Sequence, residues 1–354
     1  MTAKSFIFRA VTPLLVLLSA CENPSAPIGT GHILSVQIDS SGGPIVRAIT
    51  VELDRPAPLE ITYAGPGTPV LTISSDSTAA RHQVVLPRLR ADRAYTIEVA
   101  VPGDEASVLR ASFRTGVLPS DLAEIRFQVV GQPTVPIALV EVVGGRRFTG
   151  LLVVEDGEIV GYMAMGGRPL FGSTRRANGN VVLLDAALGL VSRRFDGSLA
   201  HRLPQPDSAP GAPYGRIHHD VIATPANTLL FIANETQPVR GEVITGEAIW
   251  EWNPETGLLV KRWSAFGHLS WDGPRERSTV GNWLHGNGIS YGPRGNVVMS
   301  LRNIDQVISI APDFSRVEWK LGGLNGSLTV ADADRFFGQH YVSEPALNRL
   351  LVYD

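Results

Sequence analysis

The chain has 354 residues with a formal net charge of −3, and 44% of them are hydrophobic against 18% charged. This apolar content is enough for real hydrophobic cores. The balance of charge excludes the strongly basic surface typical of nucleic-acid binding, so we expect no nucleic-acid partner. Short Val, Ile and Leu runs bounded by Gly, Pro, Asn and Asp dominate, and helical periodicity is nearly absent. The pattern predicts an all-β protein.

The first 21 residues have the features of a targeting segment. Two basic residues precede the apolar run AVTPLLVLLSA, which is too short for a membrane-spanning helix and is typical of a secretory signal. The single cysteine, Cys21, follows Leu-Ser-Ala. Small residues there also suit ordinary signal peptidase, but a lone cysteine at this place resembles a bacterial lipobox. This interpretation predicts lipidation at Cys21, a flexible tether over 22–32, and anchoring in the bacterial cell envelope, periplasmic or on the outer-membrane surface.

Residues 33–118 form the first predicted module. Seven short strand-like runs at this spacing suggest a β-sandwich. The segment LRADRAYTIEVAV, followed by SFRTGVLP, resembles the end of a fibronectin type III domain, where Tyr95 would be the corner tyrosine that bonds back to the backbone. The module shows no catalytic constellation, which favours a spacer or docking role. Residues 119–145 are expected to be a connector.

A strand–turn–strand unit repeats over residues 146–354. Its turn asparagines are 47, 69 and 52 residues apart, at Asn180, Asn227, Asn296 and Asn348. Units of about four strands and 40–50 residues predict the blades of a β-propeller. Only four blade-like units can be recognised, and the last stops in mid-blade. We therefore expect an incomplete, C-terminally truncated propeller, unless earlier residues supply strands that the pattern does not mark.

Three consecutive repeats carry a histidine at the start of the strand before the turn. His219 and His340 each lie 8 residues before their turn asparagine, and His285 lies 11 residues before its own in a repeat with a longer turn. Equivalent positions near the innermost strands of a propeller converge on its central channel. The sequence therefore predicts that the three imidazoles face one another.

Two more polar side chains accompany the histidines. Asn287 lies two residues after His285, on the same face of a strand, and Arg302 ends the next strand at the same rim. Three imidazoles, an amide and a guanidinium suit a tetrahedral anion, because arginine presents a planar fork to its oxygens. Taken singly, each residue also has an ordinary structural explanation, such as an ion pair between Arg302 and Asp305.

At this point the residues carry a family resemblance. The segment WLHGNGISYGPRGNVVMSLRNIDQVISIAPDFSRVEWKLGG is similar to the central signature of the bacterial arylsulfate sulfotransferases, and HHD and FFGQHYV resemble two further motifs of that family in the same order. The resemblance implies a six-bladed propeller that transfers a sulfuryl group from an aryl sulfate donor to a phenolic acceptor. It also implies that a sulfated histidine is the intermediate and that the reaction needs no nucleotide or other cofactor.

Carried over residue by residue, the resemblance implies that His340 is the nucleophile. His219, His285 and Arg302 would be the other catalytic residues, and Asn287 and His218 would bind substrate. Two other functions remain open from the residues alone. One is a non-catalytic surface propeller, an adhesin or binding module, and the other is a metal-dependent hydrolase that uses the same histidines. We expect no bound metal, because a guanidinium beside the histidines opposes a divalent cation. The sequence leaves the oligomeric state open.

Overall fold

The computed structural model describes residues 31–40, 42–131, 135–144, 147–194 and 197–353. The all-β prediction is confirmed: the regular secondary structure of the described residues consists of strands, apart from a four-residue helix, α1 (Ser120–Ala123), and short 3₁₀ turns. Among these residues, no helix has the length and apolar character needed to cross a membrane. Cys21 and the expected tether lie outside the described residues.

The first sheet contains five strands in the order β1-β2-β4-β5, with β3 also paired to β2. The strands are β1 (Ile33–Asp39), β2 (Arg47–Ala64), β3 (Leu71–Leu86), β4 (Ala94–Val101) and β5 (Asp104–Arg114). Along β2 and β4, buried apolar side chains alternate with more exposed ones, so one face of the curled sheet covers a shared core. This core includes Ile49, Ile61 and Val99.

The seven expected strands of this module are five in the structure. Two runs lie together in β2 and two more lie together in β3, because each chain segment continues through an irregular stretch instead of turning back. The pairing of β2 with β3 shifts register between Glu52 and Leu59, where Pro56 and Pro58 lack the N–H groups of a regular ladder. The expected hydrogen bond of Tyr95 is present: the backbone N–H of Arg90 donates to its hydroxyl at 2.8 Å.

The rest of the chain forms separate antiparallel sheets, three of which have four strands in sequence order. The first of the set is three-stranded, with β6 (Ile137–Val142), β7 (Gly150–Glu155) and β8 (Glu158–Ala164). The four-stranded sheets are β9 (Leu170–Arg175), β10 (Val181–Asp185), β11 (Gly189–Arg193), β12 (Leu199–Leu203); β13 (Ile217–Ala223), β14 (Leu229–Val239), β15 (Glu242–Trp252), β16 (Leu259–Ser264); and β17 (Gly286–Tyr291), β18 (Val297–Leu301), β19 (Gln306–Ile310), β20 (Val317–Gly322). The last described sheet pairs β21 (Tyr341–Ala346) with β22 (Arg349–Tyr353). Four 3₁₀ turns accompany them, η1 (Pro206–Ser208), η2 (Ala265–Gly267), η3 (Arg302–Ile304) and η4 (Asp332–Asp334).

The boundary expected at 145/146 is wrong in one respect. β6 lies inside the expected connector, yet it pairs with β7 along its whole length, from Ile137 opposite Glu155 to Val142 opposite Gly150. Five sheets therefore follow the first module within the described residues, where the repeat pattern had indicated four units. The repeat search missed the extra sheet because its turn, Asp156-Gly157, has no asparagine.

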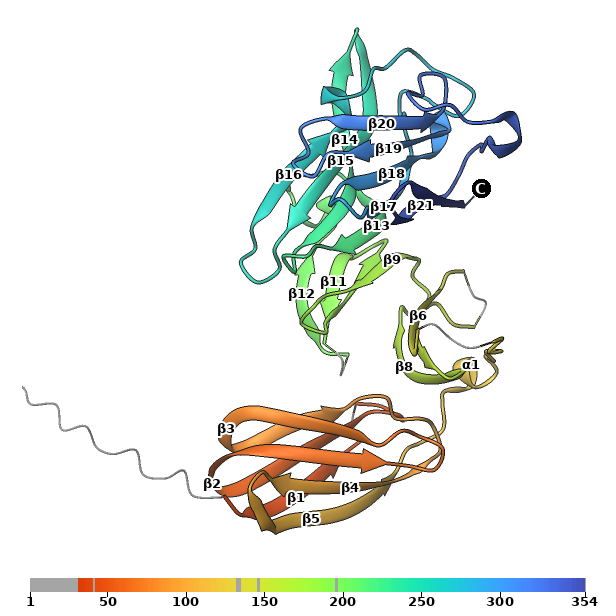
Figure 1. Ribbon diagram of the computed structural model, residues 1–354. Helices are drawn as coiled ribbons and strands as arrows, with labels where there is room; N and C mark the ends of the chain where they lie inside the picture. The colour runs from red at the N-terminus through yellow and green to blue at the C-terminus, as the bar shows by residue number, and fades with distance from the viewer. Residues whose placement is uncertain (1–30, 41, 132–134, 145–146, 195–196, 354) are drawn as a thin grey trace, which may run out of the picture.

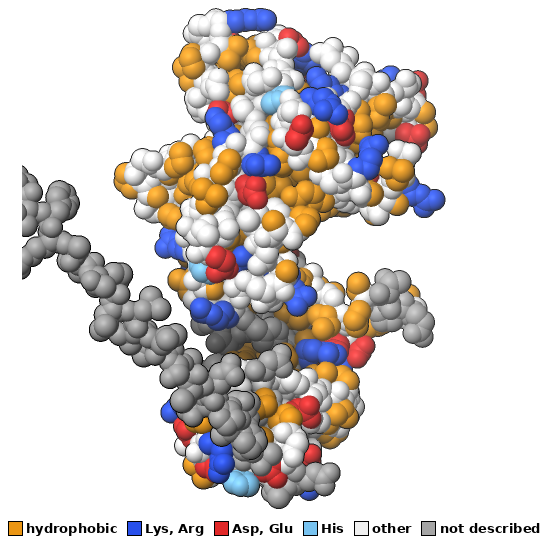
Figure 2. Space-filling view, turned by 60° about the vertical axis from the view of Figure 1, so that its left-hand side comes forward, with side chains coloured by type: hydrophobic (Ala, Val, Ile, Leu, Met, Phe, Trp, Pro, Cys, Tyr) orange, Lys and Arg blue, Asp and Glu red, His pale blue; other side chains and the backbone are white. Residues whose placement is uncertain are grey.

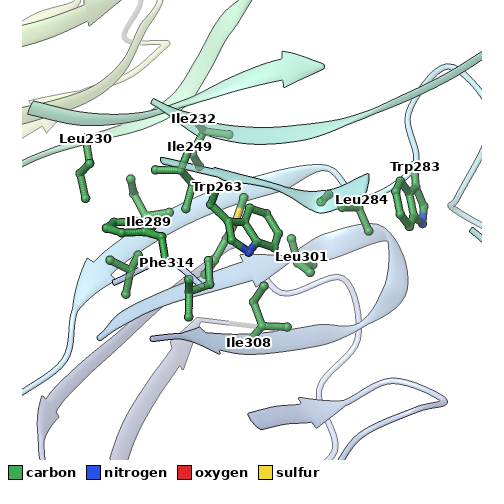
Figure 3. Close-up of a cluster of buried hydrophobic side chains, with 14 of the residues drawn as sticks. Leu230, Ile232, Ile249, Trp263, Trp283, Leu284, Ile289, Leu301, Ile308 and Phe314 are labelled. Atoms are coloured by element: carbon green, nitrogen blue, oxygen red, sulfur yellow. The ribbon is translucent and has the colours of Figure 1, made fainter. Parts of the chain in front are cut away.

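The first strand of each later sheet is the one that positions the site. β13 packs beside β9 on one side and β17 on the other, and β17 packs in turn beside β21 (Figure 1). Between neighbouring sheets lie apolar cores. The largest joins the sheet of β13–β16 to that of β17–β20 and includes Trp263, Ile249, Ile289 and Leu301 (Figure 3). These cores hold the first strands at fixed spacing, as the layers of a propeller do.

The first module contacts the three-stranded sheet through ion pairs. Arg88 pairs with Glu155, and Arg90 lies 3.0 Å from Asp156 and 2.7 Å from a Glu158 carboxylate oxygen. Elsewhere on the face in Figure 2, acidic and basic side chains are interspersed, in agreement with the balanced charge of the sequence. The ion pairs of Arg88 and Arg90 join the first module to the three-stranded sheet.

Candidate functional site

The structure brings the three repeat histidines together. His219 lies on β13, and His285 and His340 immediately precede β17 and β21. One ring nitrogen from each lies within 4.8 Å of the others. The ring of His219 is central, 4.7 Å from that of His285 and 5.9 Å from that of His340 between centroids. His340 is exposed, whereas the other two are half-buried, so a ligand reaches His340 from solvent.

The backbone at two of these histidines is in a sparsely populated conformation. His219 has φ 60° and His285 has φ 51°, both in the left-handed region. Strand pairing shifts register at the same places, between Ile217 and Val221 and between Gly286 and Gly288. A β-bulge of this kind re-aims a side chain, and strain of about 1–3 kcal/mol at such a residue is typical of functional sites.

The turn asparagines used to align the repeats are not equivalent in the structure. Gly179 and Gly295 have positive φ, and each precedes its turn asparagine, whereas Asn227 and Asn348 themselves occupy the positive-φ position. The alignments of these two repeats are therefore one residue out. His219 and His340 remain equivalent because both of their repeats are shifted by the same one residue.

Arg302 borders the histidines at the end of β18. Its backbone N–H donates to the carbonyl of His285 at 3.3 Å, and its guanidinium donates to the Asn303 side chain at 3.3 Å. Within the described part of the chain no carboxylate pairs with it. The ion pair with Asp305 that we considered from sequence is absent, because Asp305 pairs with Arg277 instead. Arg302 therefore keeps donor capacity for an anion.

Asn287 is buried and turned toward the backbone before His340. Its amide nitrogen donates to the carbonyl of Gln339 at 2.8 Å, and its Oδ1 has no hydrogen-bond partner. A buried Oδ1 without a partner is costly unless a donor from a ligand or water reaches it. The observed bond ties β17 to the residue that precedes His340, which fixes the position of that histidine.

His218 is buried, and both of its ring nitrogens contact protein groups. Nδ1 lies 2.8 Å from Nδ1 of His219, and Nε2 lies 3.0 Å from a carboxylate oxygen of Glu247. The amide nitrogen of Asn234 is also 3.1 Å from Nε2. Direct binding of substrate by His218, which the resemblance implies, would require one of these contacts to break.

The electrostatics of the site favour neutral imidazoles. Burial, followed by the neighbouring histidines and Arg302, lowers the pKa of His219 to about 3. Burial and then the charge of Arg302 lower the pKa of His285 below its ordinary value. Both rings are therefore uncharged near neutral pH, and each has a lone pair on one nitrogen and a proton on the other.

Sequence reasoning missed three residues at the site. Glu247 and Asn282 contact His218 and His285 respectively, the latter through its amide nitrogen at 3.0 Å from Nδ1. Phe171 on β9 is 39% exposed and stacks on His219 with centroids 5.9 Å apart. Glu247 belongs to no recognisable motif. Phe171 lies on β9, the first strand of the preceding sheet, so a comparison of all first strands could have found it.

A cavity of about 460 Å³ is lined in part by residues that are close in sequence to the site. Its wall includes Asn303, next to Arg302, and Phe337, three residues before His340. Arg275 and Arg277 from the loop FGHLSWDGPRERSTVGNW also line it.

Three histidine nitrogens within 4.8 Å are also a possible donor set for a metal ion, and no other such group occurs in the described residues. Three imidazoles with an open position are typical of catalytic zinc. Arg302 lies close enough to lower the pKa of two of these imidazoles, and its charge opposes a divalent cation at the same place.

Fold and site together define an all-β protein of successive antiparallel sheets whose first strands gather a polar cluster of histidines and an arginine. Residues 178–337 match the family model described as arylsulfotransferase (ASST), which confirms the resemblance over that segment. The matched segment contains His219, His285 and Arg302, and it ends three residues before His340. The match supports an enzyme of the sulfotransferase kind. No curated protein matches the chain.

Solved structures give a broader likeness. A protein of unknown function from Bacteroides caccae has 14% identity and a TM-score of 0.36, with 59% of this chain and 62% of that one covered, less than two thirds of its length. Virginiamycin B lyase from Staphylococcus aureus has 10% identity, a TM-score of 0.37 and 92% of each chain covered. YCF48 bound to D1 peptide has 9% identity, a TM-score of 0.37, and 91% and 89% covered.

Proposed function

We propose that the protein transfers a sulfuryl group from an aryl sulfate ester to a phenolic acceptor through a sulfated His340, without a nucleotide. The observation that carries the proposal is the meeting of three histidines from three consecutive sheets beside an arginine with no carboxylate partner, inside or next to the segment of arylsulfotransferase type. An aryl group also has an apolar surface at hand, because exposed Phe171 stacks on His219.

In the first step, a ring-nitrogen lone pair of His340 attacks sulfur. The bond from sulfur to the aryl oxygen breaks, and its electrons leave with the phenolate. In the second step, an acceptor phenol attacks the same sulfur, loses its proton to a base, and the sulfur–nitrogen bond electrons return to His340. Splitting the transfer in two lowers each barrier. Exposure of His340 allows both partners to approach it from the same side.

Arg302 and His285 would stabilise charge on the transferring oxygens. A guanidinium without a carboxylate partner and a neutral imidazole offer donors that are already in place, which is the condition for electrostatic stabilisation of a transition state. The backbone bond from Arg302 to His285 holds the two groups together.

The decisive experiment is to incubate the protein with an aryl sulfate and no acceptor. We expect one acid-labile sulfuryl group per chain, mapped to His340, and we expect His340→Ala to lose both the adduct and turnover. His268→Ala is the matched control, because His268 stacks on Trp263 away from the cluster. Full transfer activity in His340→Ala would refute the assignment. Stoichiometric metal lost together with activity on chelation would favour the hydrolase instead.

We also propose that the protein is held in the bacterial cell envelope through a lipid on Cys21. The support for this proposal is the sequence of the targeting segment alone, with its apolar run and Leu-Ser-Ala-Cys. Anchoring at a membrane would place the enzyme where phenols and their sulfate esters from outside the cytoplasm can reach it.

A further inference from the structure

A buried carboxylate lies behind the histidine cluster and is connected to it by a second imidazole. Glu247 on β15 is almost fully buried, with a side-chain exposure of 3%. One of its oxygens accepts the backbone N–H of Gly286 at 2.9 Å, and the other, which has no hydrogen-bond partner among the described residues, lies 3.0 Å from Nε2 of His218. A buried carboxylate oxygen without a donor is costly, so the proton of His218 belongs on Nε2.

This placement determines the protonation of the next ring. With its proton on Nε2, His218 has a lone pair on Nδ1, 2.8 Å from Nδ1 of His219. Only a proton on His219 Nδ1 makes that contact a hydrogen bond. The remaining nitrogen of His219, Nε2, then carries a lone pair. The amide of Asn234, 3.1 Å from His218 Nε2, must present its oxygen there for the same reason.

His285 is held in the opposite tautomer. The amide nitrogen of Asn282 lies 3.0 Å from His285 Nδ1, and in this orientation of the amide it donates to that nitrogen, which places the proton of the ring on Nε2. Two histidines with ring centroids 4.7 Å apart thus offer different functions: His219 an acceptor and His285 a donor. Equivalent positions in two repeats thus have different roles, because His219 contacts His218 whereas His285 contacts Asn282.

We propose that Glu247 and His218 form a proton relay that makes His219 the base for the acceptor phenol, with Glu247 and His218 as positioning residues that act through His219. The proposal rests on the sulfuryl transfer proposed above. The phenol proton moves to His219 Nε2, the Nδ1 proton of His219 moves to His218 Nδ1, and the Nε2 proton of His218 moves to Glu247. The phenol oxygen bonds to sulfur while the bond to His340 breaks.

Charge is balanced throughout, because the relay ends as a neutral carboxylic acid with two neutral imidazoles. No imidazolium has to persist beside Arg302. The stored proton returns by the same path to the next phenolate that leaves. The packing around Glu247 is close: a Cβ on Gly286 would clash with Met299 Cε and would lie 3.2 Å from the Cγ of Glu247.

Glu247→Gln is the sharpest test, since it keeps the shape and the acceptor for Gly286 but replaces the acceptor beside His218 by a donor. We expect both tautomers to reverse, so that His219 presents N–H to the site. With 4-nitrophenyl sulfate, the burst of released nitrophenol should persist, because that leaving group needs no proton. Steady-state kcat to phenol should fall about 10²-fold, the range for loss of a general base. An acceptor that is already ionised at the assay pH should restore most of it.

Glu344→Gln serves as the control, because Glu344 on β21 is similarly buried and accepts a hydrogen bond from the side chain of Asn296, outside the relay. In the wild-type protein, nitrogen-15 NMR of the imidazoles tests the relay without any substitution: Nδ1–H at His219 and Nε2–H at His285 are expected. The opposite tautomer at His219, or a Glu247→Gln enzyme with wild-type kcat for phenol, would overturn the relay. Absence of any burst from the wild type would instead overturn the proposed function.

Discussion

Replacement of Arg302 by glutamine tests two proposed effects of its charge, the stabilisation of the transferring oxygens and the lowering of the pKa of His285. The guanidinium lies beside the histidines and has no carboxylate partner among the described residues, so the donors that do not contact Asn303 can serve the sulfuryl oxygens. Loss of one such transition-state donor typically lowers kcat by about 10²–10³-fold, or about 3–4 kcal/mol. We expect that loss for Arg302→Gln with a chromogenic aryl sulfate and phenol. KM should change less, because the interaction is strongest when charge spreads over the transferring oxygens.

The same substitution should shift the pH dependence of the enzyme. The charge of Arg302 is one of the causes that hold the pKa of His285 below its ordinary value. His285 must stay neutral for its proposed role, so activity falls when pH drops through that pKa. Without the cation the pKa rises toward its ordinary value, and the acid limb of kcat/KM moves to higher pH.

A profile of kcat/KM against pH, with folded protein confirmed by circular dichroism, checks both expectations. Arg316→Gln is the control, because this arginine is exposed and pairs with Glu318 on β20. An unchanged kcat in Arg302→Gln would refute the role in the transition state. A large loss of kcat with an acid limb that stays in place would refute the electrostatic link between Arg302 and His285.

Three further outcomes are expected. Phe171→Ala should raise KM for aryl sulfates several-fold with little change in kcat, because it removes an aromatic surface and no catalytic donor; equal kinetics for both proteins would contradict aryl stacking there. Cys21→Ser should move the protein from the membrane fraction to the soluble periplasmic fraction, and a wild type that is already soluble would rule out the anchor. Deletion of 33–118 should preserve the transfer rate of folded protein but lower its melting temperature, because ion pairs and a shared apolar cluster are lost; a folded but inactive remainder would show that the module takes part in the chemistry.

The histidine cluster could be predicted from sequence because repetition carries positional information. Each sheet begins with a strand that packs beside the first strand of the next, so residues at equivalent positions meet even when they are more than 50 positions apart. His219, His285 and His340 were found in this way. The all-β composition followed from short apolar runs between turn residues, which are the same signals that end strands in the structure.

The groups behind the cluster could not be predicted in the same way. Glu247 is on β15, the third strand of the same sheet as His218, and it also accepts from Gly286 of the neighbouring sheet. The repeat pattern marked only the first strands and their turns, so it gave no signal for a carboxylate on a third strand. β6 escaped for a different reason: its partner strand begins only after a long connection, and its hairpin lacks the asparagine that marked the other turns.

The left-handed backbone at His219 and His285 connects the fold to the proposed chemistry. A regular strand would send adjacent side chains to opposite faces, so His218 and His219 could not approach each other. A positive φ at His219 interrupts the alternation and brings the two Nδ1 atoms to 2.8 Å. Nothing in the ladder requires this conformation, and it costs about 1–3 kcal/mol at a residue with a Cβ. The strain is retained where it joins a buried carboxylate to an exposed reaction site, which is the arrangement that a proton relay needs and that a purely structural blade does not.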